Sequence, residues 1–191
     1  KVTCTKSNEG FATAGGVQYV ACAGNFKDAG LEYTGALKVL QMIFSYEYLW
    51  IQIRVKGGAY GCMCSFSDQG DSMFVTYRDP NLSESYKVYD EAADYVADFD
   101  ADDRDMKKYI IGTIGSMDMP MEAVDMGARS FHAYFLGKTE ADLQKVRDQV
   151  LSCTQEDIRA LAPIVKAVVE AGNRCCIGNE EKIDQNKEYF D

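Results

Sequence analysis

The chain has 191 residues, 47% of them hydrophobic, which suits one domain with a substantial core, although two small domains would also fit. Its formal net charge of −10 argues against a nucleic-acid-binding protein, because phosphate binding depends on clustered lysine and arginine. No run of about 18 apolar residues occurs, so we expect no membrane-spanning helix.

The first predicted elements are a polar, irregular segment to about Thr13 and a strand over 17–23, where apolar residues alternate. Residues 30–34 then lead into a long helix. Its apolar residues recur at helical spacing, and they are Ala36, Leu37, Leu40, Ile43 and Phe44. We expect this helix to continue until Arg54 lies on its last turn.

A helix-to-strand corner follows at Gly57-Gly58, where only glycine reaches positive φ without steric cost. Beyond it Tyr60 begins an alternating segment that predicts a strand and includes Cys62, Cys64 and Phe66. Arg54 and Tyr60 should therefore lie at the same corner. Functional side chains are often placed at such connections.

The next elements are a hairpin and two helices. Residues 68–71 predict its turn, and Asp79-Pro80 closes its second strand. Asn81 with Glu84 resembles a capping box and predicts a helix over 82–97. Asp100 is expected to cap the next helix, whose inner face would comprise Met106, Tyr109, Ile110, Thr113, Ile114 and Met117.

Helices continue almost to the end of the chain. Pro120 suits the first turn of a helix that ends at Gly137 and carries Met121, Val124, Ala128, Phe131 and Phe135. Thr139 and Thr154, each followed three residues later by aspartate, predict two more helix starts, and Pro163 should kink or split the second. A strand over 174–177 and a polar turn or helix from Asn179 follow. Strands that bracket a block of helices indicate an α+β fold.

The seven cysteines do not form a zinc-binding pattern. Cys62 and Cys64 share one face of a strand and Cys175-Cys176 are adjacent, so neither pair has the usual two to four intervening residues. We interpret them as small core residues with free thiols. His132 is the single histidine and has no second ligand beside it, so a packed helix residue is favoured over a metal ligand.

Taken on chemistry alone, Arg54 and Tyr60 fit plain structural roles. Arg54 could neutralise the carbonyls at a helix C-terminus. Tyr60 could be a core tyrosine with its hydroxyl at the rim. The residues themselves favour these structural roles over a functional one.

The segment Arg-x-Lys-Gly-Gly-Ala-Tyr-Gly over 54–61 resembles a signature from the C-terminal half of pitrilysin/insulinase-family zinc metallopeptidases, in the presequence-protease branch. Two later blocks are similar to that branch as well: 65–82, which contains Tyr-Arg-Asp-Pro, and 176–182. Together the matching blocks span roughly residues 30–182, most of the chain.

The resemblance implies an antiparallel sheet covered by helices on one side, with 1–191 forming a single domain that closes the substrate chamber of a larger peptidase. It implies that Arg54 donates to substrate carbonyls, that Tyr60 stabilises the oxyanion formed at the scissile carbonyl, and that Gly58 and Ala59 lie at substrate-binding positions. Peptide substrates are the implied ligands. The acidic charge would attract basic peptides, although a solvated acidic surface is its commoner role.

The departure from the family is the zinc motif, His-x-x-Glu-His, which this chain lacks. We therefore expect no metal site and no activity in this chain alone; zinc would be bound by an N-terminal half, its expected partner. Two alternatives remain: a scaffold or core subunit without peptidase chemistry, and an independent peptide-binding module. Free thiols favour the cytoplasm, although an organelle matrix is also reducing.

Overall fold

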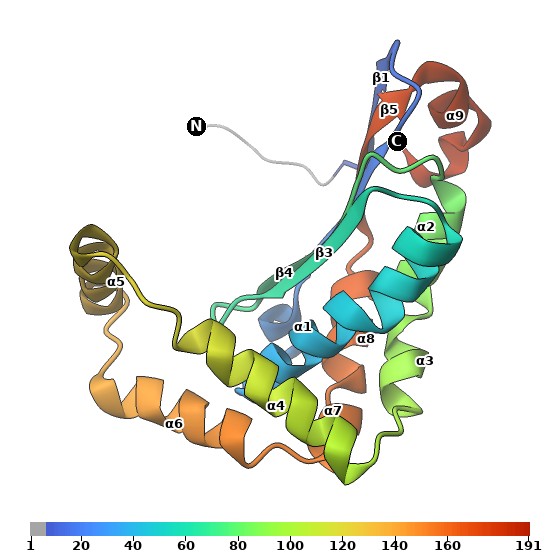
Figure 1. Cartoon of the computed structure of the whole chain (residues 1–191). Coiled ribbons are helices and arrows are strands. Elements are labelled where there is room, and N and C mark those ends of the chain that lie inside the picture. The colour runs from blue at the N-terminus through green and yellow to red at the C-terminus, as the bar shows by residue number, and fades with distance from the viewer. Residues whose placement is uncertain (1–6) are drawn as a thin grey trace.

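The computed structural model describes residues 7–191 and shows a five-stranded sheet with helices packed on one face (Figure 1). The strands are β1 (Glu9–Thr13), β2 (Tyr19–Asn25), β3 (Gly61–Phe66), β4 (Asp71–Tyr77) and β5 (Asn173–Asn179). Their order is β1-β5-β2-β4-β3, and every pairing is antiparallel except that between β1 and β5. The predicted α+β fold is confirmed.

β1 corrects the prediction of an irregular segment to Thr13. It pairs in parallel with β5, which places Phe11 opposite Ile177 and makes the sheet mixed. Its short Glu-Gly-Phe-Ala-Thr sequence carries little alternation, and its partner lies more than 160 residues away. Local pattern alone could not predict a strand created by such a distant pairing.

The predicted hairpin is confirmed as β3 and β4. The Ser67 N–H donates to the Asp71 carbonyl at 2.8 Å, and Gly70 takes a φ of 97° in the turn. The predicted strand over 17–23 corresponds to β2, displaced by two residues. Cys4 lies outside the described residues.

The helices follow the chain order that the sequence indicated. They are η1 (Phe26–Ala29), α1 (Ala36–Tyr46), η2 (Trp50–Lys56), α2 (Ser83–Asp90), α3 (Ala92–Ala97), α4 (Asp103–Met117), α5 (Ala123–Phe135), α6 (Glu140–Leu151), α7 (Gln155–Arg159), α8 (Ala162–Glu170), α9 (Glu180–Gln185) and η3 (Lys187–Tyr189). Within the described residues, none of them is long and apolar enough to cross a membrane.

Two predicted helices are divided. The helix from Ala36 ends as an α-helix at Tyr46 and continues as the π-helical η2, so Arg54 lies in a widened turn. The helix predicted over 82–97 breaks at Glu91 into α2 and α3. A period of apolar residues marks the buried side of a helix but does not reveal where its hydrogen-bonding pattern changes.

Two predicted caps are wrong. Asn81 does not cap α2; its Nδ2 donates to the Gly57 carbonyl at 2.6 Å, so a tertiary contact takes the side chain. Asp102, rather than Asp100, caps α4 and accepts from the N–H groups of Arg104 and Asp105. In an acidic run several carboxylates are equally plausible caps by sequence, and only the backbone path selects one.

The predicted start at Pro120 is wrong, because α5 begins at Ala123 with Glu122 as its N-cap. Two other predicted helix starts are confirmed. Thr139 and Thr154 each form a reciprocal capping box with the aspartate three residues later. Pro163 lies in the first turn of α8, which is separate from α7. Asn179 ends β5 and caps α9 by accepting from the Lys182 N–H.

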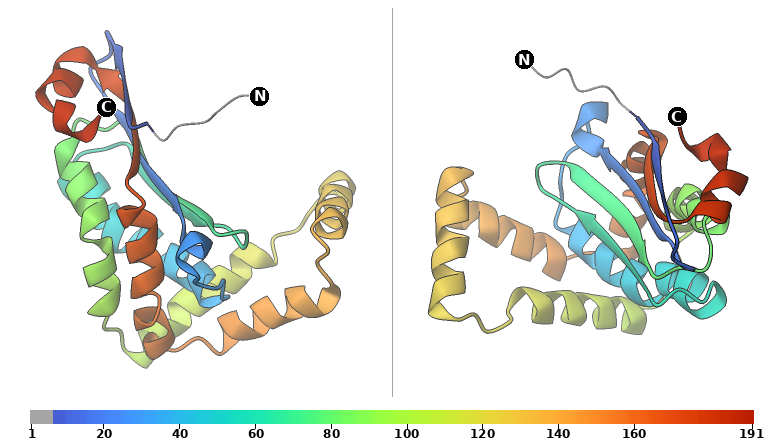
Figure 2. Two further views of the ribbon diagram at one scale, coloured as in Figure 1. Left: turned by 180° about the vertical axis from the view of Figure 1, so that it is seen from behind. Right: turned by 90° about the horizontal axis from the view of Figure 1, so that it is seen from above.

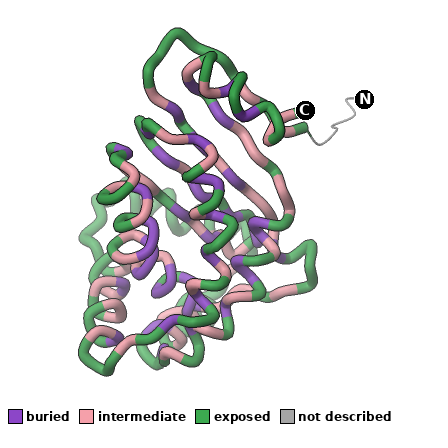
Figure 3. The backbone as a smooth tube through the Cα atoms, turned by 90° about the vertical axis from the view of Figure 1, so that its right-hand side faces the viewer, coloured by how far each residue is buried: buried purple, intermediate pink, exposed green. Residues whose placement is uncertain are grey.

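The core lies between the sheet and the helices α1, α2 and α8. Figure 3 colours the backbone by burial, and buried and exposed positions alternate along strands such as β4. The largest fully buried side chains include Phe26, Leu37, Leu40, Phe44, Phe74, Tyr86 and Tyr89. The opposite side of the sheet, hereafter the open face, exposes Phe11, Tyr19, Met63, Met73, Tyr77 and Ile177.

Helix α5 stands away from the sheet at the end of an arm formed with α4 and α6 (Figure 2). None of its residues is buried, and Val124, Phe131 and Phe135 are each more than 60% exposed. His132 is exposed on the same helix, so its prediction as a packed residue is wrong. The amphipathic pattern correctly indicates a helix but not whether this chain supplies the surface that covers it.

Candidate functional site

The corner between η2 and β3 has an unusual backbone. The Gly57 N–H donates to the Gln52 carbonyl, five residues back, and the Ala59 N–H donates to the Ile53 carbonyl. These wide turns end the helix beneath Arg54 and lead directly into β3. Short π-helical segments occur frequently at functional sites, because they re-aim side chains that a regular helix would place elsewhere.

The two glycines serve different purposes. Gly58 has a φ of 80°, as predicted for the corner, whereas Gly57 has an ordinary φ of −78°. A Cβ on Gly57 would lie 2.6 Å from the Ile53 carbonyl oxygen, so close backbone approach excludes a side chain there. The Asn81 amide also holds the Gly57 carbonyl. The corner is therefore fixed by sterics from one side and by a hydrogen bond from the other.

Arg54 lies between two aromatic rings. Its guanidinium carbon is 5.7 Å from the ring centroid of Trp50 and 5.7 Å from that of Tyr60. Nη1 donates to the Ala59 carbonyl at 3.1 Å. Part of the guanidinium thus stabilises the corner, and its buried Nε is left without a hydrogen-bond partner among the described residues.

Tyr60 is 66% exposed, so the interpretation of a core tyrosine is wrong. Its N–H donates to the Tyr77 carbonyl at 3.1 Å, and its ring meets that of Tyr77 edge to face at 5.8 Å. Tyr77 contacts Tyr19 in the same manner at 5.5 Å. The ring of Tyr60 is therefore held from both sides, by Tyr77 and Arg54, at the end of a tyrosine row.

Gly58 and Ala59 contribute differently from the two long side chains. Ala59 is fully buried, and both of its backbone groups are bonded, to Ile53 and to Arg54. It therefore positions Arg54 from inside the fold. At Gly58 a Cβ would meet nothing closer than the Pro80 Cγ at 3.7 Å, so the surface beside Tyr60 is open.

Asp79, which follows β4, fixes the end of the hairpin through buried hydrogen bonds. It is fully buried, accepts from the Ser85 hydroxyl at 2.6 Å and the Asn81 N–H at 2.9 Å, and its backbone exchanges two hydrogen bonds with Gln18. Burial raises the pKa of Asp79, and the hydrogen bond from Ser85 partly opposes this. Arg78 does not pair with Asp79; it is exposed and takes a φ of 49°.

The sequence indicated Arg54 and Tyr60 but not the residues that hold them. Trp50 precedes Arg54 by four residues, a helical spacing that could have suggested their contact. Asn81, Asp79 and Tyr77 belong to a different element and meet the corner only after the hairpin has formed. No local signal in the sequence identifies that relationship.

The metal-binding donors do not fit a zinc site. Among the described residues, no three side chains of histidine, cysteine, aspartate or glutamate come together. Cys62, Cys64, Cys153, Cys175 and Cys176 are unpaired thiols. Burial raises the pKa of Cys62 to about 11 and that of Cys176 to about 12, so neither is a thiolate nucleophile near neutral pH.

Comparisons with known proteins place these features in a family context. The protein-family model described as the PreP C-terminal domain matches residues 8–179 of this chain. Protein HypA of Clostridium perfringens is 44% identical over 97% of this chain, and presequence protease 1 of Arabidopsis thaliana is 34% identical over 93%. The chain spans only 19% and 16% of those two proteins.

The fold also resembles a solved structure, the peptidase M16 inactive domain from Pseudomonas fluorescens. The match has a TM-score of 0.66 and covers 89% of this chain and 43% of that one, at 16% sequence identity. At this identity the likeness concerns the fold alone.

Proposed function

This chain belongs to the PreP C-terminal domain family, and on that premise we propose that it is the substrate-contacting domain of a larger zinc-dependent peptidase that degrades peptides. One observation carries the proposal: Arg54 and Tyr60 converge at a rigid corner, with Tyr60 exposed. Neither side chain fills the core, so the elaborate support of the corner serves a surface site.

Tyr60 would donate its hydroxyl to the scissile carbonyl. A rigidly held donor stabilises the negative charge that develops on this oxygen in the transition state, and removing one such donor typically slows catalysis on the order of a hundredfold. The packing of its ring against Tyr77 and Arg54 supports this role, because the hydroxyl is already oriented before the substrate binds.

Arg54 would bind the peptide backbone. Its guanidinium offers a planar fork of donors to carbonyl oxygens, and Trp50 and Tyr60 hold the plane in place. Gly58 leaves the approach to both side chains open, while Ala59 fixes Arg54 from within the fold. The donors would orient a peptide so that its carbonyl reaches Tyr60.

The rest of the peptidase would cover two apolar surfaces. The open face and α5 both expose large apolar side chains, an arrangement typical of surfaces that meet a partner. We infer that an N-terminal half, which would also bind the zinc, covers them and closes a chamber over Tyr60. On this proposal the chain contributes hydrogen bonds to the substrate, and the zinc ligands come from the N-terminal half.

The test is peptide hydrolysis by the full-length protein that contains this domain. We expect Tyr60→Phe to lower kcat on the order of a hundredfold with little change in KM, because the lost donor acts in the transition state. Tyr134→Phe is the matched control: it removes the hydroxyl of a tyrosine that is 79% exposed on α5, away from the corner. Equal activities of the two variants would contradict the proposed role of Tyr60.

Arg54 is tested in the same assay. Arg54→Ala should raise KM as well as lower kcat, since peptide orientation is lost before the chemical step. Arg54→Lys keeps the charge but not the fork and should recover little of the loss. This chain alone should not hydrolyse peptides, and the N-terminal half added in trans should restore activity.

The alternative is a scaffold without peptidase chemistry. It predicts that the full-length protein stays inactive with zinc supplied. Activity that chelation abolishes would exclude it. The cytoplasmic location stays a prediction, and the Arabidopsis thaliana relative is described as chloroplastic/mitochondrial.

A further inference from the structure

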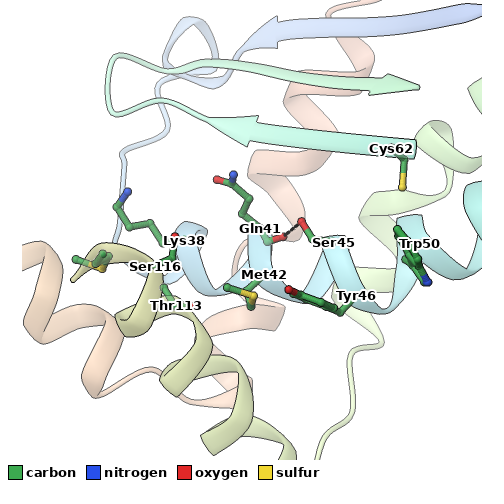
Figure 4. A pocket seen from close by; sticks show the side chains of 10 residues that line it. Lys38, Gln41, Met42, Ser45, Tyr46, Trp50, Cys62, Thr113 and Ser116 are labelled. Atoms are coloured by element: carbon green, nitrogen blue, oxygen red, sulfur yellow. Dashed lines mark hydrogen bonds between the residues drawn. The ribbon is translucent and has the colours of Figure 1, made fainter. Parts of the chain in front are cut away.

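A groove of about 800 Å³ runs beside β3, the edge strand of the sheet (Figure 4). Its floor is α1, its far wall is α4, and Cys62 points into it from β3. The lining residues used below are Lys38, Gln41, Ser45, Trp50 and Cys62. Lys38 and Trp50 mark its two ends, and no acidic side chain lines it among the described residues.

The backbone of β3 has free hydrogen-bonding groups above this groove. The N–H of Ser67 donates to the carbonyl of Asp71, which lies directly opposite it in the register. The backbone N–H and carbonyl groups of the odd-numbered residues of β3 therefore point toward β4. The backbone groups of Cys62, Cys64 and Phe66 therefore face outward, where no other described segment bonds to them. Unpaired groups on an edge strand are a template for pairing with another chain.

The groove is continuous with the candidate site. Trp50 lines the groove and also holds the guanidinium of Arg54, which in turn contacts Tyr60. A chain that pairs with β3 would thus lead directly to the two side chains proposed to contact the scissile bond. Its inward side chains would enter the groove above α1.

We propose that the edge of β3 binds an extended segment of peptide substrate as an additional strand, with alternate side chains in the groove. This inference rests on the proposed function and extends it by naming the form in which substrate is held. The six residues of β3 span about 20 Å, enough for a segment of about six residues. Backbone pairing supplies affinity, and the groove supplies selection among side chains.

The lining predicts what that segment contains. Gln41, Ser45 and Trp50 suit small neutral or apolar side chains, while Lys38 at the far end suits an acidic side chain or a terminal carboxylate. Lys38 is exposed, but the protein around it partly desolvates its side chain and so lowers its pKa; Lys138 and Arg129 act in the same direction and Asp68 opposes them. An anion beside Lys38 would relieve this effect.

Another domain of the same protein is a less suitable occupant. A domain interface is best formed by a continuous apolar surface, which α5 and the open face provide. The groove instead combines a free backbone edge with one cation and a lining that mixes polar side chains with apolar ones such as Met42 and Tyr46. That combination matches an extended peptide, which brings its own unpaired N–H and carbonyl groups.

The test uses this chain and a capped peptide of about six residues that alternates valine and serine and ends in glutamate. Trp50 is the only tryptophan in the sequence and lies at the groove, so its fluorescence reports binding directly. Two further peptides carry N-methyl groups at odd or at even residues. Only one set of amides faces β3, so one analogue should bind at least about tenfold more weakly and the other nearly as well.

Hydrogen exchange gives an internal control within the strand. Bound peptide should slow exchange at the amides of Cys62, Cys64 and Phe66 and leave Met63 and Ser65, which already bond to β4, unchanged. Ser45→Phe should abolish binding by filling the groove. Ser152→Phe is its matched control, since both hydroxyls bond to the carbonyl four residues earlier and Ser152 lies outside the groove.

Equal binding of both N-methylated analogues would overturn strand pairing, as would a peptide at millimolar concentration that leaves Trp50 fluorescence and exchange unchanged. Protection that grows with protein concentration in the absence of peptide would show that a second copy occupies the edge. If these experiments fail while Tyr60→Phe still lowers kcat, the proposed function stands and only the β3 inference falls. If Tyr60→Phe leaves kcat unchanged while the peptide pairs with β3, the β3 inference stands and the proposed role of Tyr60 falls.

Discussion

The corner glycines provide the sharpest test of how the fold positions Arg54 and Tyr60. In Gly58→Ala the new Cβ has space, since the nearest atom is 3.7 Å away, but the φ of 80° becomes unfavourable. Left-handed backbone costs a residue other than glycine about 1–2 kcal/mol. Gly58→Asn should cost less, because asparagine tolerates this region better.

Gly57→Ala should act by a different mechanism and cost more. Its φ is compatible with alanine, but the Cβ would lie 2.6 Å from the Ile53 carbonyl and 3.1 Å from that of Gln52. Because both neighbours are backbone atoms of η2, relief requires the π-helical turn to move. Overpacking of this kind typically costs about 1–3 kcal/mol, and here the movement would also displace Arg54.

The assay is urea unfolding of this chain, paired with kcat of the full-length protein. In a domain of this size a loss of about 1 kcal/mol lowers Tm by about 2–4 °C. We expect Gly57→Ala to lower both stability and kcat, whereas Gly58→Ala should lower mainly stability. Gly115→Ala in α4, where nothing lies within 4 Å of the new Cβ, should instead stabilise by up to about 1 kcal/mol. A silent Gly57→Ala would refute the steric account of the corner.

Three further predictions concern the remainder of the fold. Phe131→Ser should change the free energy of unfolding of this chain by less than about 0.5 kcal/mol, since Phe131 is 64% exposed. The same substitution should lower the activity of the full-length protein, because it removes an apolar contact with the N-terminal half. Thr154→Ala removes the capping box of α7 and should cost about 1 kcal/mol in urea unfolding, while Thr154→Ser should cost much less. The pKa of Asp79 is raised on folding, so ionisation of this carboxyl opposes folding. The stability of the wild type relative to Asp79→Asn should therefore fall as the pH rises above about 4, and a rise would contradict this sign.

Local patterns in the sequence predicted most elements because their determinants are local. Apolar spacing indicated α1 and α4, and the capping boxes at Thr139 and Thr154 placed two helix starts correctly. Arg54, Tyr60 and the positive φ of Gly58 were likewise visible, since a glycine that follows a helix commonly adopts the left-handed conformation. The family resemblance then suggested a role for the two side chains.

The failures share a physical cause, which is competition from distant parts of the chain. β1 exists because β5 pairs with it, and Asn81 is not a cap because the Gly57 carbonyl takes its amide. The π-helical turn likewise depends on the close approach of Gly57 to the Ile53 carbonyl. Such contacts decide between local alternatives that differ by about 1 kcal/mol, which is too little for propensity to resolve.

The groove beside β3 and the exposed helix α5 show why an amphipathic pattern does not by itself locate a core. In both places the chain presents unsatisfied surface, but the chemistry differs. α5 exposes apolar side chains whose own backbone is bonded within the helix, so only apolar contact can stabilise it. β3 exposes backbone donors and acceptors, which water satisfies when the edge is free and another strand satisfies when it is occupied. A permanent neighbour suits the first surface and an exchanging peptide suits the second. For this reason we assign the partner domain to α5 and the substrate to the edge of β3.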